Sequence, residues 1–457
     1  MNPYSEIVKS QLDFFNTNAT KDTNFRIKQL KKLIKVLKDN EPLLDEAIYK
    51  DFKKSSFENY ETELSLVYHE INLSIKKLKS WSKRKSISTN MANIPGKSYI
   101  IPEPLGVTLT IGAWNYPYQL AFAPVVAALS AGNTAIIKPS ELSLNSSNAM
   151  AKIINENFDS NYFHVIEGGV EETTNLLKLK FDKIFYTGST NVGKIIMKAA
   201  AEHLTPVTLE LGGKSPSFVF NDANIKITAQ RLVWAKFLNG GQTCVAPDFI
   251  LAEKGVKAKL IEEIKNQIKN IYGGNPMDSD AFVRIISPRH YKRLVSLIDN
   301  SRTIIGGDTN EKELYISPTV LYNITFDDEI MQEEIFGPIL PIIEFDDLSW
   351  AIKMVKERPK PLALYIFSSS NKTINRILHE ISFGGGAVND AIMHLSNSKL
   401  PFGGVGESGM GNYHGKAGFD SFTHYKSILS KSTIIELPIK YPPYSDWKRK
   451  LMEKLIE

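Results

Sequence analysis

The only cysteine of the chain, Cys244, is the first residue whose type and surroundings point to chemistry. It follows the polar, flexible stretch Asn-Gly-Gly-Gln-Thr and precedes Val-Ala-Pro. A thiolate is a strong nucleophile, and backbone N–H groups beside it can hold a developing oxyanion. A lone cysteine is more often a small buried hydrophobic residue. Its own segment therefore leaves Cys244 as either a nucleophile or a core residue.

Two polar residues inside apolar segments are candidates to assist such a nucleophile. Glu210 lies in the strand-like run Val207–Leu211, directly before a Gly-Gly pair. An acid at the end of a buried strand can have a raised pKa and act as a general base, whereas an acid on a solvated face would do neither. Asn115 lies in Gly-Ala-Trp-Asn-Tyr-Pro, where its amide can either donate to an oxyanion or cap a turn.

Two segments are candidates for binding a nucleotide. The run from Gly188 to Gly193 follows a strand-like segment and precedes a helical one, so free N–H groups at that helix N-terminus can accept phosphate oxygens. Ile195 stands where a P-loop needs Ser or Thr, which argues against a nucleotide hydrolase. Lys138 and Glu141 follow another apolar strand and can hydrogen-bond a ribose diol. A plain glycine turn and a solvated charged turn are the alternatives.

A third nucleotide-like motif is a poor candidate. The segment from Gly404 to Gly409 matches G-x-G-x-x-G, but the short run before it contains a proline and is not a strand. That fingerprint binds a dinucleotide only between a strand and a helix. We therefore interpret this stretch as a glycine-rich loop.

The segments that must position these residues alternate between strand and helix patterns. The first ninety residues are polar, Lys-rich and helical in periodicity. Short apolar runs predict strands at Val107–Ile111, Thr134–Ile137, Tyr162–Ile166, Lys183–Tyr186, Val207–Leu211, Phe249–Ala252 and Pro361–Phe367. Helical periodicity predicts helices at Ala121–Ser130, Ser146–Asn157, Thr173–Leu179, Val192–Ala201 and Val256–Ile271. This alternation predicts an α/β fold with parallel sheets covered on both faces.

Glycine-rich or basic segments end the chain. Phe383–Asn389 and Pro401–Gly411 are predicted as loops. The basic tail contains Trp447, Leu451, Met452 and Leu455 at the spacing of a short amphipathic helix.

Composition limits the class of protein. A length of 457 residues predicts about two to three domains. A net charge of +5 on such a chain is too small to indicate nucleic-acid binding. A single cysteine excludes an intramolecular disulfide and a cysteine-based metal cluster, and fits a reducing, intracellular setting.

The N-terminus lacks the pattern of a signal peptide. The uncharged segment Gly106–Ile137 contains Asn115 and two prolines, and predicts a buried unit rather than a membrane span.

Taken together, the motifs resemble those of the aldehyde dehydrogenase superfamily. Seven of them occur in the family's order: Trp114-Asn-Tyr-Pro117, Lys138-Pro-Ser-Glu141, Phe185-Tyr-Thr-Gly-Ser189, Leu209-Glu-Leu-Gly-Gly-Lys214, Gly241-Gln-Thr-Cys244, Glu333-Glu-Ile-Phe-Gly-Pro338 and Pro401-Phe-Gly-Gly404. The match runs from about residue 20 to 440, and the ending Ser408–Gly415 resembles the class 3, or fatty-aldehyde, branch.

The resemblance implies a fold with three parts. These are a Rossmann-like NAD(P)-binding domain from residues 1–84 and 107–210, a catalytic α/β domain from 211–424, and a small β oligomerisation element from 85–106 and 425–440, followed by a tail from 441–457. The β-rich segments Lys97–Pro102 and Lys426–Ile435 suit the oligomerisation element. Relatives of this branch are typically dimers, and we expect a cytoplasmic homodimer without nucleic-acid or integral membrane contacts.

The resemblance also implies residue roles. Cys244 matches the nucleophile, Glu210 the general base and Asn115 the oxyanion donor. Residues matching cofactor contacts are Trp114, Lys138, Glu141, Gly188, Ser189, Val192, Gly193, Glu334 and Phe336. Those expected to line the substrate tunnel are Tyr116, Trp234 and Thr243.

The expected reaction is NAD(P)-dependent oxidation of a medium- or long-chain aliphatic or aromatic aldehyde to its acid, through a cysteine thiohemiacetal and thioester. NAD is the expected cofactor, NADP a second one, and no metal is needed. A CoA-acylating relative would not need Glu210, and a cysteine hydrolase would need a partnering histidine that no motif provides. A non-catalytic relative would not need all three catalytic matches.

Overall fold

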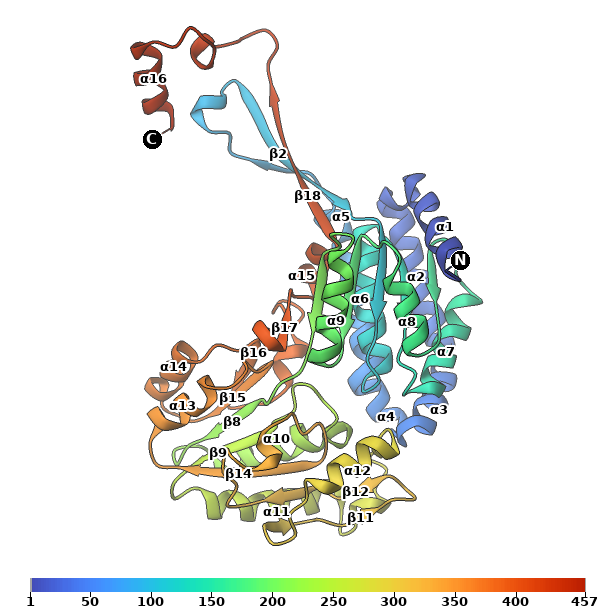
Figure 1. The fold of residues 1–457 in the computed structure, drawn as a ribbon, viewed down its shortest axis with the longest axis vertical. Helices are drawn as coiled ribbons and strands as arrows, with labels where there is room; N and C mark the ends of the chain where they lie inside the picture. Colours follow the sequence, from blue (N-terminus) through green and yellow to red (C-terminus); the bar gives the residue numbers. More distant parts are fainter. Residues whose placement is uncertain (1, 457) are drawn as a thin grey trace.

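The computed structural model describes residues 2–456, which form two large, mainly parallel sheets and one narrow antiparallel sheet. Figure 1 shows the two large sheets in the body of the molecule, each with helices against it, and the narrow sheet projecting from the body as an arm. A two-stranded hairpin, β11 (Thr309–Asn310) and β12 (Tyr315–Ile316), completes the sheets. The predicted α/β class with parallel sheets is confirmed.

The first sheet has the strand order β17-β7-β6-β3-β4-β5. Its strands are β3 (Val107–Ile111), β4 (Thr134–Lys138), β5 (Phe163–Val165), β6 (Lys183–Thr187), β7 (Val207–Glu210) and β17 (Gly409–Met410). All neighbours are parallel except β17, which runs antiparallel to β7. The chain first builds β3, β4 and β5 in one direction, then returns to place β6 on the other side of β3. That reversal leaves a crevice at the carboxyl ends of β3 and β6, where open α/β sheets bind ligands.

Helices cover both faces of this sheet. Alternate residues of β4 divide between two cores, because successive strand side chains point to opposite faces: Ala135 and Ile137 join one core and Ile136 the other. The first core also contains α2 (Thr23–Asp39), α3 (Glu41–Phe52), α5 (Ser65–Trp81), α6 (Pro117–Ala131) and α7 (Leu144–Asn155). The second contains residues of α1 (Ser5–Asn16), α8 (Val170–Leu177) and α9 (Thr190–Ala201).

The predicted strands and helices of this region are confirmed, with ends that differ by a few residues. The largest difference is α6, which begins at Pro117 rather than four residues later. Pro117 occupies its first turn, where a missing N–H costs nothing, and the Glu63 carboxylate accepts the N–H groups of Tyr118 and Gln119. The partner that extends this helix comes from a distant part of the chain.

The second sheet has the order β10-β13-β14-β9-β8-β15-β16. Its strands are β8 (Pro216–Val219), β9 (Phe249–Glu253), β10 (Thr303–Ile305), β13 (Thr319–Leu321), β14 (Ile339–Phe345), β15 (Ala363–Phe367) and β16 (Gly385–Val388). Its helices are α10 (Ile225–Phe237), α11 (Lys257–Tyr272), α12 (Pro288–Ser296), α13 (Leu348–Lys356) and α14 (Asn371–Glu380).

The prediction of a loop at Phe383–Asn389 is wrong, because residues 385–388 form β16, parallel to β15. A Cβ at Gly386 would overlap the Leu364 carbonyl oxygen. The glycines here therefore permit close approach of two strands rather than a turn. In the stretch Pro401–Gly411 the predicted loop is interrupted by a β-bridge from Phe402 to Tyr413, by a 3₁₀ turn at Gly406–Ser408 and by the two-residue strand β17.

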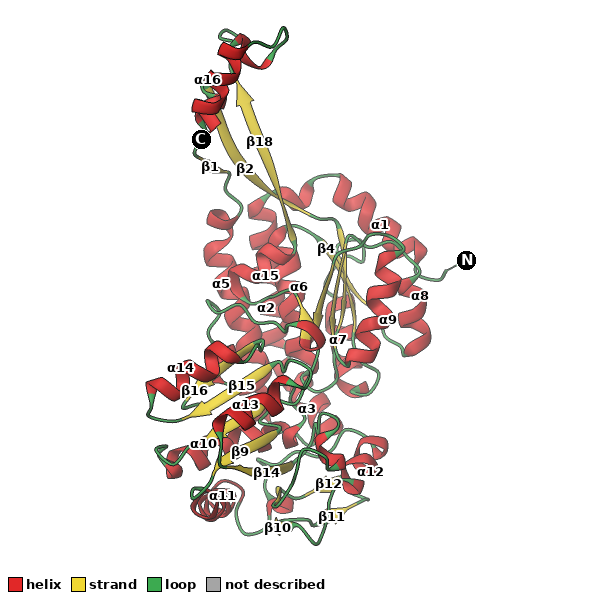
Figure 2. Cartoon of the chain, turned by 60° about the vertical axis from the view of Figure 1, so that its left-hand side comes forward, coloured by secondary structure: helices red, strands yellow, loops and turns green. Residues whose placement is uncertain are grey.

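The arm is a three-stranded antiparallel sheet with the order β1-β2-β18. Its strands are β1 (Lys85–Ile87), β2 (Gly96–Pro104) and β18 (Thr423–Lys431). Strand β18 ends four residues before the predicted Ile435. Helix α16 (Asp446–Ile456), the predicted amphipathic helix, lies at the tip of the arm (Figure 2).

The segment after residue 408 packs on the first sheet and its helices. β17 pairs with β7, and α15 (Gly415–Ser421) packs against α5 and α6, so residues after about 408 return to the first sheet. In residues 2–456 no helix is long and apolar enough to cross a bilayer.

The crossing between the two sheets sets the position of the site. Strand β7 ends at Glu210, the Gly212-Gly213 turn follows, and β8 begins at Pro216. The carboxyl ends of the strands in the first sheet therefore face the loops that lead into the strands of the second sheet. Cys244 precedes β9 and Glu334 precedes β14 in this arrangement.

Candidate active site

The loop that carries Cys244 has an unusual backbone held by side chains. Asn239, Gly240 and Gly241 all have positive φ, at 52°, 61° and 72°. The Gln242 side chain then locks the loop, since its amide donates to the carbonyls of Asn239 and Arg284 at 3.0 and 3.1 Å. Gln242 Oε1 accepts the Ile286 N–H at 3.0 Å. The polar residues before Cys244 therefore form a rigid turn that fixes the position of Cys244.

The Cys244 side chain is partly accessible from a cavity, although protein surrounds the sulfur closely. Burial raises the pKa of the thiol to about 12, and the carboxylates of Glu334 and Glu210 contribute. The interpretation of Cys244 as an inert core residue does not fit a thiol that opens onto a cavity and lies near two acids.

The Asn115 side chain lies against this loop. Its amide Nδ2 donates to the Gln242 carbonyl at 3.0 Å, two residues before Cys244. The Asn115 carbonyl in turn accepts from Asn239 Nδ2 at 2.8 Å. The next residue, Tyr116, shares a hydrogen bond of 2.6 Å with the Thr243 hydroxyl. The loop after β3 and the loop that carries Cys244 are therefore joined at three points.

Glu210 is a buried acid without a partner. The residue is 2% exposed, and neither carboxylate oxygen has a hydrogen-bond partner among the described residues. Burial raises the pKa of Glu210 well above its ordinary value. The solvated interpretation of this acid is therefore wrong: Glu210 lies in a dry environment close enough to influence the Cys244 thiol.

Glu334 occupies space that only a glycine leaves open. A Cβ at Gly212 would overlap Glu334 Oε2, and the Gly213 N–H donates to the same carboxylate. Burial and the Asp248 charge raise the pKa of Glu334 to about 8, against the opposing effect of Lys214 and Lys236.

An ion pair between Lys214 and Asp248 holds the backbone on both sides of Glu334. Lys214 Nζ donates to the Glu333 carbonyl at 2.8 Å, and the Ile335 N–H donates to Asp248 Oδ1 at 3.0 Å. Sequence reasoning assigned neither Lys214 nor Asp248 a role. Lys214 lies within one of the family motifs, which was the available signal.

Phe336 and Trp114 lie together beside this segment. Phe336 has φ 51°, and its ring meets the Trp114 ring edge-on at 5.3 Å between centroids. Trp114 also contacts Phe52 and His290 at 6.3 and 5.2 Å. Trp114 thus supports Phe336 from behind, within an aromatic cluster.

The proposed cofactor residues of the first sheet lie at its carboxyl edge, after β4 and β6. Ser189 is the N-cap of α9, its hydroxyl accepts the Val192 N–H at 3.4 Å, and both residues are exposed. Glu141 is also exposed.

Lys138 differs from its neighbours, because its side chain is buried. Its Nζ donates to the carbonyls of Pro139 and Gly168 at 2.6 and 2.5 Å and to Glu141 at 3.5 Å. An ammonium group has three donors, so Lys138 is fully engaged within the protein. A ribose contact by Lys138 requires one of these bonds to be exchanged.

These residues fit a dinucleotide. Helix α9 is 12 residues long, and its free N-terminal N–H groups follow Gly188, where a Cβ would overlap the Tyr186 hydroxyl. Gly193 in its first turn packs on Leu211, which brings the helix close to the sheet. The apolar side chains of Val192 and Ile195 near the start of α9 are exposed at 40% and 61%.

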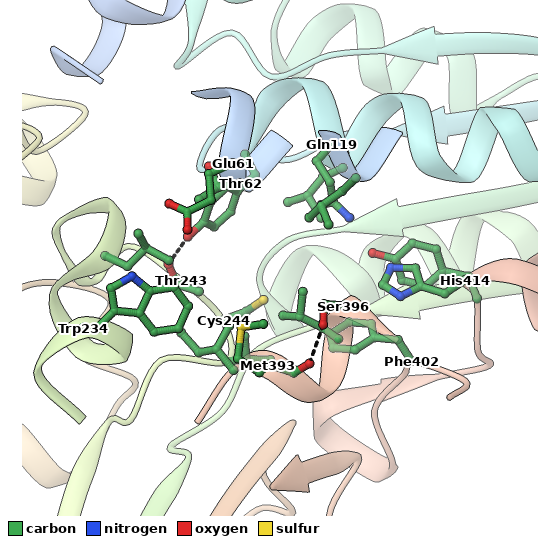
Figure 3. Close-up of a pocket in the computed structure, with 18 residues that line it drawn as sticks. Glu61, Thr62, Gln119, Trp234, Thr243, Cys244, Met393, Ser396, Phe402 and His414 are labelled. Atoms are coloured by element: carbon green, nitrogen blue, oxygen red, sulfur yellow. Dashed lines mark hydrogen bonds between the residues drawn. The ribbon is translucent and has the colours of Figure 1, made fainter. Parts of the chain in front are cut away.

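A cavity of about 160 Å³ opens beside Cys244 (Figure 3). Cys244, Thr243 and Trp234 lie on one side of it, Gln119 lies opposite, and Phe402 and His414 close another side. All three predicted tunnel residues, Tyr116, Trp234 and Thr243, line it. Residues that sequence reasoning missed include Glu61, Thr62, Leu120, Ile392, Met393 and Tyr413.

Within the described part of the chain, no three His, Cys, Asp or Glu side chains group so as to hold a metal ion. The Gly404–Gly409 segment does not face a ligand crevice either. A Cβ at Gly409 would overlap the Leu209 carbonyl, and the Leu211 N–H donates to the Ser408 carbonyl at 3.1 Å. That loop packs against the strand that carries Glu210.

Comparison with known proteins places this arrangement in a family. The sequence profile described as "Aldehyde dehydrogenase family" matches residues 4–428. A 4,4'-diaponeurosporen-aldehyde dehydrogenase of Staphylococcus aureus is 51% identical over 433 residues, covering 94% of each chain. An "Aldehyde dehydrogenase, dimeric NADP-preferring" of Rattus norvegicus is 44% identical over 445 residues, covering 97% of this chain and 98% of that one.

A solved structure agrees. The substrate-bound state of Staphylococcus aureus AldH is 49% identical, covers 100% of both chains and superposes with a TM-score of 0.98. The chain therefore belongs to the aldehyde dehydrogenase family, whose members are NAD(P)-dependent oxidoreductases that convert aldehydes to carboxylic acids.

Proposed function

We propose that Cys244 is the nucleophile, Glu210 the general base and Asn115 the oxyanion donor of aldehyde oxidation in this protein. One observation carries the proposal: an unpartnered, buried carboxylate lies near the only thiol of the chain, and that thiol opens onto a cavity. Leaving a charged group unpaired inside a protein costs free energy, so such an arrangement is expected where chemistry requires it.

In the first half of the reaction the Cys244 thiol releases its proton to solvent water, and the thiolate sulfur attacks the aldehyde carbon to form the oxyanion of a thiohemiacetal. The Asn115 amide, together with the Cys244 N–H, would stabilise the oxyanion, and losing one such donor typically costs about 2.7–4 kcal/mol. In the structure the Asn115 Nδ2 group donates to the Gln242 carbonyl. An amide nitrogen has two donors, so the second remains for substrate.

In the second half Glu210 takes a proton from water as the water oxygen attacks the thioester carbon, and the carbon–sulfur bond then breaks, releasing the carboxylic acid and returning the Cys244 thiolate. The raised pKa of Glu210 suits this role, because it makes the carboxylate a stronger base than that of an exposed glutamate. When bound, NAD(P)⁺ supplies the acceptor for the hydride that leaves the thiohemiacetal. Glu334 and Phe336 would hold its nicotinamide half, Ser189 and Val192 its pyrophosphate, and Glu141 its adenosine ribose.

The cavity favours apolar aldehydes. Its lining is dominated by Leu, Ile, Met, Phe and Trp side chains, among them Leu66, Leu120, Trp234, Leu238, Ile392 and Phe402. We infer a medium- or long-chain aliphatic or an aromatic aldehyde as substrate, since apolar surface of that kind gains free energy on burial. The Staphylococcus aureus relative is named for an aldehyde, diaponeurosporenal, which is consistent with such a cavity.

NAD is proposed as the preferred cofactor, because the exposed Glu141 carboxylate would accept from a ribose 2′-hydroxyl and repel a 2′-phosphate. NADP remains a second cofactor, as in the rat relative named NADP-preferring. We also propose a cytoplasmic homodimer built through the arm. Its support is the projecting sheet with a free β18 edge, and a catalytic thiol that requires a reducing compartment.

Two other activities are less well supported. A CoA-acylating enzyme would not need the buried Glu210. A cysteine hydrolase needs a histidine that pairs with Cys244, but the cavity histidine His414 stacks on Phe402, and burial lowers its pKa to about 4.

The direct test replaces the nucleophile. Cys244→Ala should abolish the rise in absorbance at 340 nm with every aldehyde and either cofactor, because no other thiol exists in the chain. NAD⁺ binding and thermal stability should stay near those of the wild type. Residual dehydrogenase turnover in this variant would contradict the proposal.

A further inference from the structure

Three charged residues from the N-terminal part of the chain are buried beside the active site without a role in the reaction just described. Lys54, Glu58 and Glu63 are 0%, 6% and 0% exposed. They flank or lie within the short helix α4 (Ser56–Asn59) and the π-helical turn η2 (Tyr60–Leu64). Lysine and glutamate are almost never fully buried unless they are paired, and π-turns occur often at functional sites.

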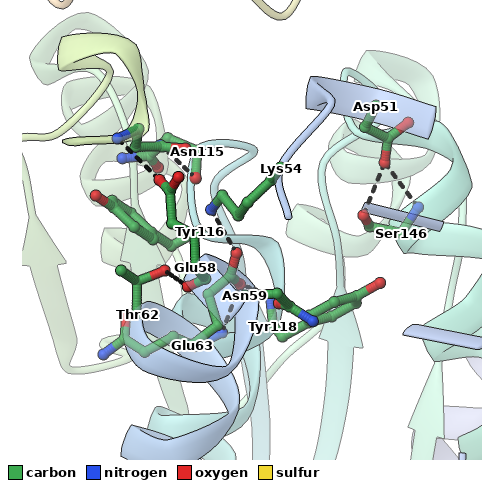
Figure 4. Close-up of polar contacts among 12 residues, drawn as sticks. Asp51, Lys54, Glu58, Asn59, Thr62, Glu63, Asn115, Tyr116, Tyr118 and Ser146 are labelled. Atoms are coloured by element: carbon green, nitrogen blue, oxygen red, sulfur yellow. Dashed lines mark hydrogen bonds and ion pairs between the residues drawn. The ribbon is translucent and has the colours of Figure 1, made fainter. Parts of the chain in front are cut away.

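Glu63 and Lys54 hold the loop that carries Asn115 (Figure 4). They form an ion pair of 2.8 Å, and Glu63 Oε2 accepts the Tyr118 N–H at 2.7 Å at the start of α6. Lys54 Nζ lies 4.5 Å from the centre of the Tyr116 ring. This pair therefore fixes the residues that directly follow Asn115.

Glu58 holds the other loop. Its Oε1 accepts the Asn239 N–H at 3.0 Å, at the first of the three positive-φ residues that precede Cys244. Asn239 Nδ2 donates to the Asn115 carbonyl at 2.8 Å and to the Gln242 carbonyl at 3.2 Å. One residue, Asn239, is thus anchored by Glu58 and bonded to both loops of the site.

A positive φ at a non-glycine residue persists only where its surroundings enforce it. Because Asn239 is such a residue and is buried, its N–H must find an acceptor within the protein. Among the described residues that acceptor is Glu58. Without Glu58, the N–H would be left unpaired and the backbone free to leave its left-handed conformation.

We propose that Glu58 is a positioning residue of the reaction: by accepting the Asn239 N–H, it fixes the Cys244 loop against Asn115, so that the sulfur and the oxyanion donor meet at one point. The proposal rests on the roles of Cys244 and Asn115 given above. Glu58 contacts neither the sulfur nor the Asn115 amide, and acts through Asn239.

The test substitutions either keep or remove the group that accepts the hydrogen bond from the Asn239 N–H. Glu58→Gln keeps an oxygen that can accept the Asn239 N–H. Burial also raises the pKa of Glu58 to about 7, so a neutral amide is a fair substitute. Glu58→Met has a similar length and no acceptor. Asp182→Asn is the control, because Asp182 also accepts a backbone N–H, from Val107 at 2.8 Å, but at the opposite end of β3 from Asn115.

The first readout needs neither cofactor nor substrate. Since Cys244 is the only cysteine, the rate of iodoacetamide alkylation of the native protein reports on its loop alone. We expect Glu58→Met to change this rate by about threefold or more, and Glu58→Gln and Asp182→Asn to leave it near the wild-type value.

The second readout separates positioning from stability. Glu58→Met should slow the NADH burst with a good aldehyde by about 10- to 100-fold, because a misplaced reacting group can lose about that factor. Its affinity for NAD⁺, measured by calorimetry, should stay unchanged, because none of the residues assigned to the cofactor lies on the Cys244 loop. Glu58→Gln should restore the burst rate.

The proposal is overturned if Glu58→Met reacts and turns over like the wild type, if Glu58→Gln is impaired equally, or if Asp182→Asn shows the same losses. If Glu58→Met does not fold, Glu58→Asp carries the same expectation, since it shortens the reach to Asn239 and keeps the charge beside Lys54. Turnover in Cys244→Ala would instead overturn the assigned nucleophile, and the alkylation rates would still decide whether Glu58 orders the Cys244 loop.

Discussion

At the scale of single residues, Glu210 combines two properties that rarely occur together. It is buried and unpaired, and it lies beside the only thiol of the chain. Acids on the surface are solvated, whereas buried acids with a structural role are paired with another group, as Glu63 is with Lys54. The absence of a partner among the described residues leaves both Glu210 oxygens available to water, which is what a general base needs.

The sequence singled out Cys244, Glu210 and Asn115 as candidates, because each is a polar or reactive type inside a segment that does not otherwise need it, and the family resemblance implied their roles. It could not predict Glu58, since one acid in a polar, Lys-rich helical region resembles any solvated residue. It also could not show that the Lys138 amine turns onto the Gly168 carbonyl, because that partner comes from a different loop.

Cofactor choice depends on a single carboxylate. Glu141→Gln should raise kcat/KM with NADP⁺ relative to NAD⁺ by about 1.4- to fivefold, because an exposed charge interaction is worth about 0.2–1 kcal/mol. Steady-state kinetics with both cofactors measure this ratio, and Glu156→Gln, also exposed, is the control. A ratio that does not move would place Glu141 away from the ribose.

At the scale of elements, the alternation of apolar strands and helices was predictable because both periods are local properties of the sequence. The start of α6 was not, because the Glu63 carboxylate that caps it lies more than fifty residues away. Strand β16 was missed for a related reason. Glycine usually marks turns, and only the neighbouring strand β15 shows that close approach is the requirement here.

The turn after β7 allows a sharp test of the Glu334 assignment. In Gly212→Ala the added Cβ would overlap Glu334 Oε2, so the flexible glutamate must move while the backbone can remain. We expect NAD⁺ affinity by calorimetry to fall about tenfold or more, as for loss of a hydrogen bond to a charged group.

Gly274→Ala is the control for that substitution, because a Cβ there meets nothing within 4 Å. The alkylation rate of Cys244 should change little in either variant. Unchanged NAD⁺ affinity in Gly212→Ala would show that Glu334 does not hold the cofactor.

At the scale of the whole molecule, the buried Glu210 should make the free energy of unfolding depend on pH. The folded protein holds the Glu210 proton more tightly than the unfolded chain, because burial raises the pKa of Glu210 well above 4.5. The contribution of the buried Glu210 to stability is therefore fully present below about pH 4.5, where the unfolded chain is also protonated, and is lost as the pH rises through the raised pKa of the folded state.

Glu210→Gln cannot ionise, so its melting temperature should exceed that of the wild type by a margin that grows between pH 5 and pH 9. Differential scanning calorimetry across this range measures the margin, with the exposed Glu202→Gln as control. Parallel pH curves for Glu210→Gln and the wild type would mean that Glu210 is not buried as an acid.

Exposed apolar side chains and a strand edge on the arm and at its tip predict that two copies of the chain associate. Ile434, Tyr444 and Trp447 are 93%, 79% and 56% exposed there, and β18 has a free edge. Exposed apolar groups and strand edges of this kind are usually covered by a partner. Sedimentation should give a mass near twice the 51.3 kDa of the chain, and removal of residues 432–457 should weaken the dimer. A monomer at micromolar concentration would contradict this prediction.

The measurement that tests the central claim most directly is intact-protein mass spectrometry of Glu210→Gln, after rapid mixing with NAD⁺ and a good aldehyde. If Cys244 is the nucleophile and Glu210 activates only water, the thioester should form and persist. The spectrum should show one acyl group per chain, located on Cys244 by peptide mapping. An NADH burst approaching one equivalent should precede a steady state slowed about 10²–10⁴-fold, the usual worth of a general base. Unmodified Cys244 and no burst would show that Glu210 acts before the thioester forms, and unchanged turnover would remove Glu210 from the mechanism.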